Sequence, residues 1–299
     1  MRWKGNRRSD NIDDRRSRRV VRSGGTRSSM MPLILQLTRS RGGWVVIVIA
    51  AGLMFFTGTD LSTLLGLAGG QTPQSSSTVV QQSAEEAETV EFMATVLADT
   101  EDTWATLLSK GQTPYKEPKL VLYRDSTRSA CGLGQSAMGP FYCPGDQKIY
   151  LDLSFFEQLS SRYGAPGDFA QAYVLAHEVG HHVQTLLGIS ARNHEARQRA
   201  TPVEANLLSV RQELQADCFA GLWANKADQA RQILESGDVE EALAAATAIG
   251  DDTLQRQAQG RVTPDSFTHG SAEQRLRWFT IGLEQGSINS CNTFATNTL

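Results

Sequence analysis

Cysteine and histidine are scarce in this chain of 299 residues, which contains four cysteines and five histidines. Four cysteines are too few for a fold built on disulfides, although they suffice for two bridges. No internal repeat occurs at periods of about 20–50 residues, which argues against a repeat protein. Hydrophobic residues make up 40% of the chain and charged residues 20%. This composition excludes wholesale disorder, collagen-like sequence and a membrane protein with many spans.

Acidic residues are rare in the first 42 residues. This segment holds twelve Lys and Arg residues against three Asp residues, a net charge of +9, whereas the complete chain has a net charge of −3. The remaining residues therefore carry a net charge of −12. The basic segment 15–19 has no interleaved aromatic residues and belongs to no folded motif. We interpret it as a topology signal at anionic lipid rather than a nucleic-acid-binding arm, and we expect no nucleic-acid partner.

Charged residues are absent between Gly42 and Thr59, and residues 44–56 are apolar throughout. Extended to residue 61, this segment approaches the ~20 residues that a helix needs to cross a bilayer. A buried core helix and a cleaved signal peptide are the alternatives. Because the basic block adjoins the apolar run, we predict a transmembrane signal anchor over residues 43–61. The N-terminus is then cytoplasmic, the following domain is periplasmic or extracellular, and the lipid bilayer is a partner.

The sequence predicts four parts: a basic cytoplasmic arm (1–42), the anchor (43–61), a flexible linker rich in Gly, Ser and Gln (62–82), and a folded domain (83–299). Within the domain, hydrophobic periodicity and capping patterns predict helices and strands. The helices span about 83–109, 169–187 and 201–226, with further starts at 238 and 271; the strands span 120–123 and 148–152. The expected fold class is α+β and mostly helical, with a small sheet. Strand 148–152 is a candidate edge strand for aligning an extended peptide.

His177 and His181 belong to the sequence His-Glu-Val-Gly-His. On a helix, residues i and i+4 share one face, so both imidazoles can bind one metal ion. Glu178 lies one residue round the helix, where it can act as a general base on water instead of binding the metal. The neighbouring residues are apolar, and burying these polar side chains without partners would be costly. The pattern therefore indicates a metal site rather than two histidines satisfied within a core.

Catalytic zinc takes three protein ligands and keeps a fourth position for water. Glu213, on a later and largely apolar helix, is the predicted third ligand. Asp217 follows it at i+4 on the same face and is predicted to accept a histidine N–H as an outer-shell carboxylate. Three other residues are weaker candidates for the third ligand. His182 points away round the helix, His194 lies in a polar segment, and Cys218 lies off the ligand face.

Several motifs resemble the neutral zinc metallopeptidase family of bacterial membrane proteins. They are residues 1–11, the loop 139–144, and the motif segments 177–184, 213–221 and 269–275. Glu-x-x-x-Asp downstream of His-Glu-x-x-His is also similar to the gluzincin arrangement of metallopeptidases. The resemblance covers essentially the whole chain. It implies a membrane-anchored, zincin-like zinc protease domain, and it implies no particular substrate.

The expected activity is that of a zinc metalloendopeptidase with one zinc per chain, acting on a peptide or protein in the cell envelope. Glu178 would take a proton from water and return it to the leaving amine. His269, in a Gly-flanked loop, is the preferred donor to the oxyanion, and Tyr173 is a weaker candidate. Two alternatives stay open: a non-catalytic, membrane-tethered module for envelope assembly, and a zinc amidase acting on cell-wall peptide.

The four cysteines suit an oxidising compartment outside the cytoplasm. Of the three ways to pair them, we predict Cys131–Cys143 and Cys218–Cys291. The first bridge closes a local Gly-rich segment. The second ties the C-terminal tail to the helix that carries Glu213.

Overall fold

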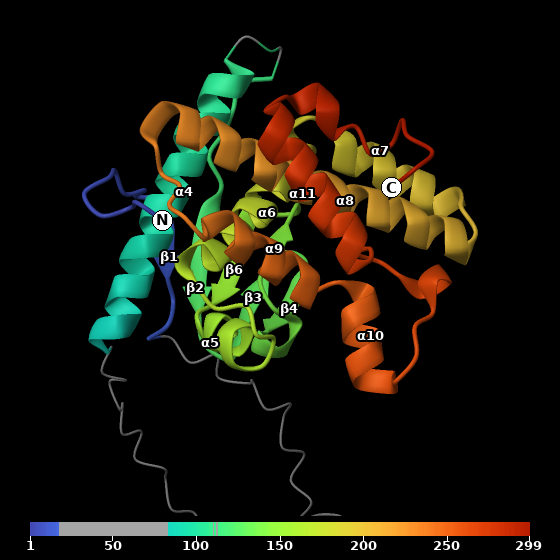
Figure 1. The fold of residues 1–299 in the computed structure, drawn as a ribbon, viewed down its shortest axis with the longest axis horizontal. Coiled ribbons are helices and arrows are strands. Elements are labelled where there is room, and N and C mark those ends of the chain that lie inside the picture. The colour runs from blue at the N-terminus through green and yellow to red at the C-terminus, as the bar shows by residue number, and fades with distance from the viewer. Residues whose placement is uncertain (18–82, 110, 112) are drawn as a thin grey trace, which may run out of the picture. The chain divides into compact units, whose positions relative to one another are not determined.

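The computed structural model describes residues 1–17, 83–109, 111 and 113–299, and these residues belong to one folded unit (Figure 1). The strands are β1 (Ile12–Asp14), β2 (Lys119–Tyr123), β3 (Ser126–Ser129), β4 (Gly132–Gln135), β5 (Phe141–Cys143) and β6 (Lys148–Asp152). The helices are α4 (Ala84–Leu108), α5 (Ser154–Ser161), α6 (Asp168–Leu186), α7 (Ile189–Arg199), α8 (Pro202–Arg231), α9 (Asp238–Ala248), α10 (Asp251–Gln259) and α11 (Ala272–Gln285). The described residues thus have a mostly helical α+β fold with two small sheets.

The larger sheet has the strand order β1-β2-β6-β5, in which β1, β2 and β6 are parallel and β5 is antiparallel to β6. Its two central strands are almost entirely buried because their sequences, KLVLY and KIYLD, are apolar on both faces. The prediction that residues 148–152 form an edge strand is wrong, because β6 lies between β2 and β5. The edge beside it is β5, which contacts α6. β3 and β4 form a separate antiparallel hairpin.

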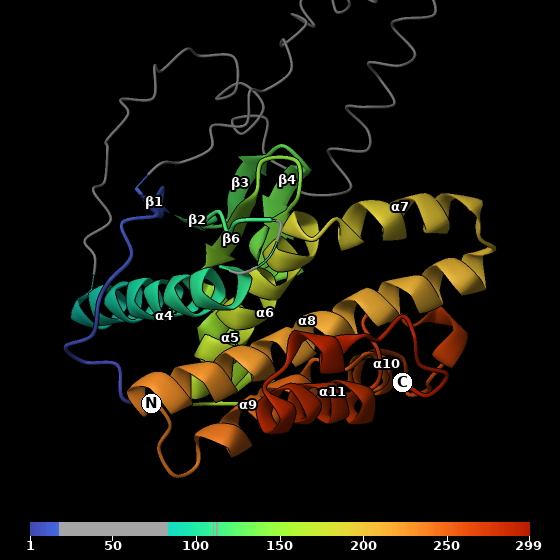
Figure 2. The same ribbon diagram turned by 90° about the horizontal axis from the view of Figure 1, so that it is seen from above.

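Three helices, α6, α8 and α11, pack closely because glycines lie where they cross. A Cβ atom on Gly221 of α8 would overlap the backbone oxygen of Phe279, and one on Gly282 of α11 would overlap that of Cys218. On α6, a Cβ atom on Gly180 would lie 3.0 Å from the backbone oxygen of Ala216. Figure 2 shows α11 running beside α8. These close approaches bring polar side chains from three helices within hydrogen-bonding distance of one another.

Helix ends agree with the capping patterns at two of the three predicted starts. Thr201 caps α8 and Ser271 caps α11, each in a reciprocal capping box. α9 begins at Asp238, as predicted, but its N-cap is Gly237 and the expected side-chain cap is absent. Glu241 instead accepts a hydrogen bond from the backbone N–H of Phe169, at the start of α6 (3.0 Å).

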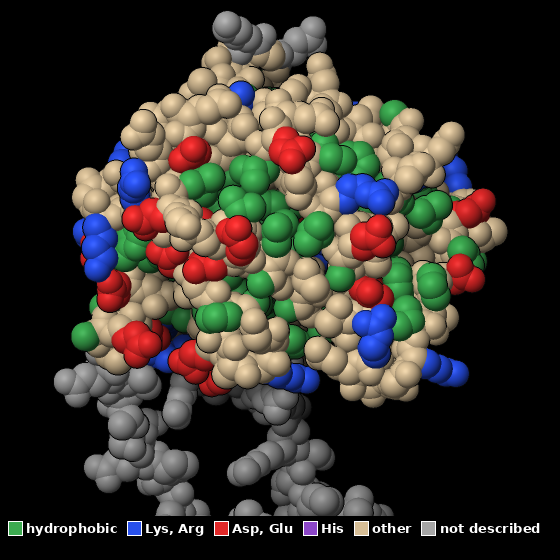
Figure 3. Space-filling model, in the orientation of Figure 1, with side chains coloured by type: hydrophobic (Ala, Val, Ile, Leu, Met, Phe, Trp, Pro, Cys, Tyr) green, Lys and Arg blue, Asp and Glu red, His purple; other side chains and the backbone are tan. Residues whose placement is uncertain are grey.

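The N-terminal residues 1–17 pack on the domain formed by residues 83–299. β1 pairs in parallel with β2, and the ammonium group of Met1 lies 3.0 Å from Asp168 at the start of α6. Basic side chains of this arm pair with the acidic face of α4: Lys4 with Glu88, Arg7 with Glu101 and Asp102, and Arg8 with Glu91. At the left of Figure 3, Lys and Arg side chains lie beside Asp and Glu side chains. Arg15 and Arg16, from the segment interpreted as a signal, pair with Asp13 and Asp14 of the arm, and Arg16 also pairs with Glu86 of α4. The described basic residues thus have acidic partners within the protein, most of them on α4.

The predicted localisation needs correction for the same reason. An arm that packs on the domain cannot lie on the opposite side of a membrane from it, as a cytoplasmic N-terminus and an extracytoplasmic domain would require. The predicted anchor (43–61) and linker (62–82) lie outside the described residues. Within the described ranges, no helix combines the length and apolar character needed to cross a bilayer. We correct the fold class to the mostly helical α+β domain alone, and we withdraw the transmembrane signal anchor and the single-pass membrane localisation.

Both predicted disulfides are confirmed. Cys131 pairs with Cys143, and Cys218 pairs with Cys291. The second bridge ties the C-terminal segment after α11 to the middle of α8. It also excludes Cys218 as a metal ligand, because its sulfur is bonded to another sulfur.

Candidate metal centre

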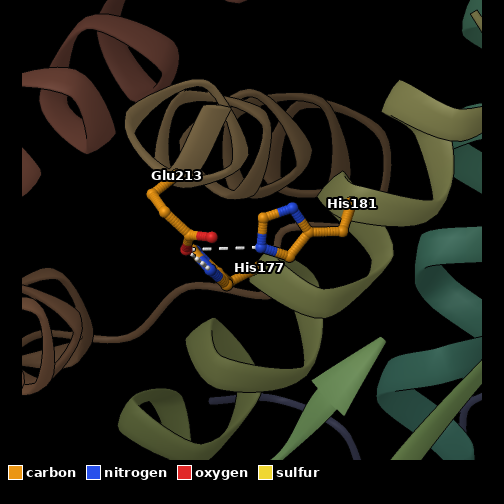
Figure 4. A group of neighbouring side chains, drawn as sticks. All are labelled: His177, His181 and Glu213. Carbon is orange, nitrogen blue, oxygen red and sulfur yellow. Dashed lines mark hydrogen bonds and ion pairs between the residues drawn. The ribbon is translucent and has the colours of Figure 1, made fainter. Parts of the chain in front are cut away.

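His177 and His181 of α6 and Glu213 of α8 lie together where the two helices cross (Figure 4). Glu213 Oε2 is 3.2 Å from His177 Nε2 and 3.4 Å from His181 Nε2. One ligand atom from each of the three residues lies within 4.8 Å of the other two. The structure therefore assembles the three residues that sequence spacing predicts as a ligand set.

The arrangement of these three side chains fits a zinc ion. Nδ1 of His177 lies 2.8 Å from Asp217 Oδ1, and Nδ1 of His181 lies 2.9 Å from Gln184 Oε1. Each acceptor holds one ring N–H and leaves the Nε2 atom directed at Glu213. Two ligands at about 2.0–2.1 Å from a tetrahedral ion are about 3.3–3.4 Å apart, which matches the separations between Glu213 and the imidazoles.

The local charges favour a cation between these groups. Burial lowers the pKa of His177, but the carboxylates of Asp217 and Glu213 outweigh it and raise that pKa to about 10. Burial likewise raises the pKa of Glu213, but the two imidazoles outweigh it and hold that pKa well below its usual range. The carboxylates of Asp217 and Glu213 therefore make the space beside the two imidazoles favourable for positive charge.

Asp217 connects His177 to α11. Arg275 of α11 donates two hydrogen bonds to the Asp217 carboxylate, each 2.9 Å long, and the Tyr173 hydroxyl donates a third of 2.5 Å. Burial raises the pKa of Asp217, yet Arg275 and His177 outweigh it and lower that pKa to about 2. Tyr173 is thus engaged with Asp217, which weakens its candidacy as an oxyanion donor. The role of Arg275 was missed by sequence reasoning. The pattern that could have indicated it is the position of Arg275 one helical turn before the apolar residues Trp278 and Phe279, on the same helix face.

Glu178 and the three metal-site residues line one cleft of about 390 Å³. Apolar and aromatic side chains form much of the remaining wall, among them Met138, Phe141, Phe155, Tyr163, Val174, Ile249 and Leu254. The segment 136–142, which runs into β5 and is restrained at that end by the Cys131–Cys143 bridge, supplies one side of this wall. The cleft therefore places a carboxylate and an apolar surface next to the candidate metal site.

His269 also lines this cleft, from the loop between α10 and α11. Asp251 Oδ2 accepts hydrogen bonds from three successive backbone N–H groups, those of Thr268, His269 and Gly270. Asp251 Oδ1 lies 3.3 Å from His269 Nδ1, and this hydrogen bond raises the pKa of His269. Asp251 was missed by sequence reasoning, because its partners lie 17–19 residues further along the chain.

The other two histidines lie elsewhere. His182 is buried, with its Nε2 atom 2.5 Å from the backbone oxygen of Lys116 and its Nδ1 atom 3.1 Å from the Tyr142 hydroxyl. His194 is exposed on α7, where its partner is Gln198. Neither belongs to the metal-capable group, as the sequence analysis expected. The polar segment around His194, residues 189–199, forms a helix.

The chain matches the family model described as "Putative neutral zinc metallopeptidase" over residues 1–294. It belongs to this family. The chain is also 50% identical over 296 residues to the uncharacterized protein YpfJ of Escherichia coli (strain K12), covering 98% of this chain and 99% of that protein. It is 44% identical over 191 residues to the uncharacterized protein Rv2575 of Mycobacterium tuberculosis (strain H37Rv), covering 60% of this chain and 64% of that protein. No solved structure gives a significant match.

Membership in this zinc metallopeptidase family names zinc as the metal that the donor set should hold. Two imidazoles and one carboxylate are also a ligand set of catalytic zinc sites, in which a fourth position stays open. The donor set around Glu213 is therefore compatible with zinc, the metal that the family match implies.

Proposed function

We propose that this protein is a zinc-dependent endopeptidase that binds one zinc ion per chain through His177, His181 and Glu213. The observation that carries the proposal is the convergence of these three ligand atoms within 4.8 Å of one another, at the wall of a cleft that also contains Glu178. A structural zinc site needs no general base and usually closes its fourth position. The base in the cleft therefore favours catalysis over a non-catalytic assembly module.

When bound, zinc acts as a Lewis acid that polarises the scissile carbonyl and lowers the pKa of a water ligand to about 7. Glu178 takes a proton from the attacking water and later donates it to the nitrogen of the leaving amine. Asp217 holds the ring of His177, so that its Nε2 atom stays directed into the cleft.

His269 is the proposed donor to the oxyanion that forms on the carbonyl oxygen. Its Nδ1 atom faces Asp251, which leaves the Nε2–H group to face the substrate. Because Asp251 raises the pKa of His269, the ring is cationic over a wider pH range and is a stronger hydrogen-bond donor. The apolar wall of the cleft suits the side chains of an extended peptide.

The test compares the full-length wild-type protein with the Glu178→Gln variant. We expect stoichiometric zinc in both, measured by elemental analysis, and cleavage of a peptide library by the wild type. The variant should turn over about 10²–10⁴-fold more slowly, because an amide cannot accept the proton. Glu273→Gln, at an exposed position on α11, is the matched control and should keep full activity.

Three results would contradict the proposal. Absence of zinc from the wild type would remove its basis, and near-normal turnover in Glu178→Gln would place the base elsewhere. Cleavage of cell-wall peptides but of no peptide library would favour the zinc amidase instead.

A further inference from the structure

Two buried glutamines lie between α6 and α8, behind the metal site. Gln184 of α6 has no exposed surface and Gln215 of α8 is 4% exposed. Each carries an amide whose burial is costly unless its donors and acceptors find partners. Apolar side chains of the same size would fill this space without that requirement. The amides therefore call for an explanation other than packing.

Hydrogen bonds connect His181 to both glutamines. The Nδ1–H group of His181 donates to Gln184 Oε1 (2.9 Å). The Gln184 amide in turn donates to the backbone oxygen of Gln212 (2.7 Å) and to Gln215 Oε1 (3.2 Å). The orientation of the Gln184 amide is therefore set by α8, and through that amide α8 sets the tautomer and ring plane of His181.

The hydrogen-bonded path ends at the C-terminal segment. Gln215 Nε2 donates to the backbone oxygen of Cys291 (2.9 Å), and Cys291 is bonded to Cys218 of α8. The Thr293 hydroxyl donates to the backbone oxygen of Arg211 (2.6 Å), which adds a second attachment to α8. The segment 291–293 is thus held on α8 and in turn orients the Gln215 amide.

The two imidazoles of the site are held by different means. His177 has a carboxylate, Asp217, whose position is secured by Arg275. His181 has a neutral amide, that of Gln184, which is held by the backbone oxygen of Gln212 and by the amide of Gln215. Loss of the Gln184 amide would leave the backbone of α6 in place but free the ring of His181. Loss of the Gln215 amide would remove one of the two bonds that orient Gln184.

We propose that Gln184 and Gln215 are positioning residues for His181, and that they make zinc affinity depend on the placement of the disulfide-bonded C-terminal segment 291–293. This inference rests on the metal site proposed above. It assigns no chemical step to either glutamine. Its consequence is that zinc affinity should respond to substitutions on α8 and in the segment 291–293, even where the substituted residue does not contact a metal ligand.

The first test replaces Gln184 by methionine, which keeps the length of the side chain and removes its hydrogen bonds. Three quantities are measured on the full chain: zinc affinity by competition with a chelator, the visible absorption spectrum of the Co²⁺ form, and the melting temperature without metal. We expect Gln184→Met to lower zinc affinity about 10–100-fold, as for other lost outer-shell partners, and to change the Co²⁺ spectrum. Gln171→Met, on the same helix but without a bond to a metal-site residue, is the matched control and should leave both unchanged.

The second test is a double-mutant cycle with Gln215→Met, which leaves the bond between His181 and Gln184 intact. This variant should also lower zinc affinity, but by less than Gln184→Met does. In the Gln184→Met background it should have no further effect, because the path is already interrupted. Gln215→Met also preserves the test if Gln184→Met yields too little folded protein.

The outcomes separate this inference from the proposed function. A wild-type protein that binds no zinc contradicts both. A wild type that binds zinc, with Gln184→Met lowering only the melting temperature and leaving affinity and the Co²⁺ spectrum unchanged, overturns the positioning role alone. Additive losses in the cycle would show that Gln215 acts on the metal independently of Gln184.

Discussion

His177 and Asp217 lie on different helices, and the Nδ1 atom of the imidazole is 2.8 Å from Oδ1 of the carboxylate. The same carboxylate neutralises Arg275, whose side chain is 4% exposed. One acidic group thus orients a proposed metal ligand and compensates a buried cation. The site and the packing of α8 against α11 therefore depend on the same residue.

Asp217→Asn should damage both functions of this carboxylate. The amide keeps the shape but leaves the Arg275 charge buried without a counter-ion, so the free energy of unfolding should fall by about 3–5 kcal/mol. Zinc affinity should fall about 10–100-fold, because His177 loses its outer-shell acceptor. Urea unfolding and chelator competition measure the two effects. The control is Asp102→Asn at the exposed pair with Arg7, where the change should stay within about 1 kcal/mol.

His269→Gln should lower kcat about 10²–10³-fold, the range for a lost oxyanion donor, and should leave zinc content unchanged. Asp251→Asn should remove the negative charge of the acceptor that raises the pKa of His269. Because the ring then loses its proton at lower pH, the alkaline limb of the kcat profile should move to lower pH. His194→Gln on α7 is the control for both. Loss of zinc from His269→Gln would instead make His269 a ligand.

The ammonium group of Met1 should stabilise the fold in a pH-dependent way. Burial lowers its pKa, but Asp168, Glu235 and Asp238 outweigh it and raise that pKa from 8.0 to about 10. A raised folded pKa means that the stabilisation is complete below pH 8.0 and is lost as the pH rises through about 10. The loss should be about 1–2 kcal/mol, since Asp168 and Glu235 are partly exposed and solvent screens them.

Thermal unfolding between pH 7 and about 10.5 tests this expectation. A protein carrying extra residues before Met1 lacks an ammonium group at this place, so it should be less stable at pH 7 and should lose less stability as the pH rises. If the melting temperatures of the two proteins fell equally with rising pH, the ammonium group of Met1 would make no measurable contribution to stability.

The two disulfides should contribute unequally to stability. They join residues separated by 12 and 73 positions. In the chain-entropy model, loops of these lengths correspond to about 3 and about 4 kcal/mol. Replacing Cys218 and Cys291 together by serine should therefore destabilise the protein more than replacing Cys131 and Cys143. Mass spectrometry under non-reducing conditions checks the pairing, and four free thiols would contradict it.

Local patterns in the sequence were sufficient to predict much of the site. The spacing of His177 and His181, and that of Glu213 and Asp217, places each pair on one helix face, because a helix repeats every 3.6 residues or so. The caps at Thr201 and Ser271 are also local, since the donor and acceptor lie three residues apart. Such features depend on neighbours in the chain, and neighbours can be read from the sequence.

The tertiary structure alone decided the contacts between residues that lie far apart in the chain. Arg275 reaches Asp217 across 58 positions, Gln215 reaches the carbonyl of Cys291 across 76, and the ammonium group of Met1 reaches Asp168 across 167. The basic arm illustrates the limit of composition, because its described charges, which suggested a membrane signal, prove to pair with acidic residues of the arm itself and of the folded domain. A charge or an amide is compatible with many partners. Only the packing of the helices, set by their apolar faces and crossing glycines, selects which of them it meets.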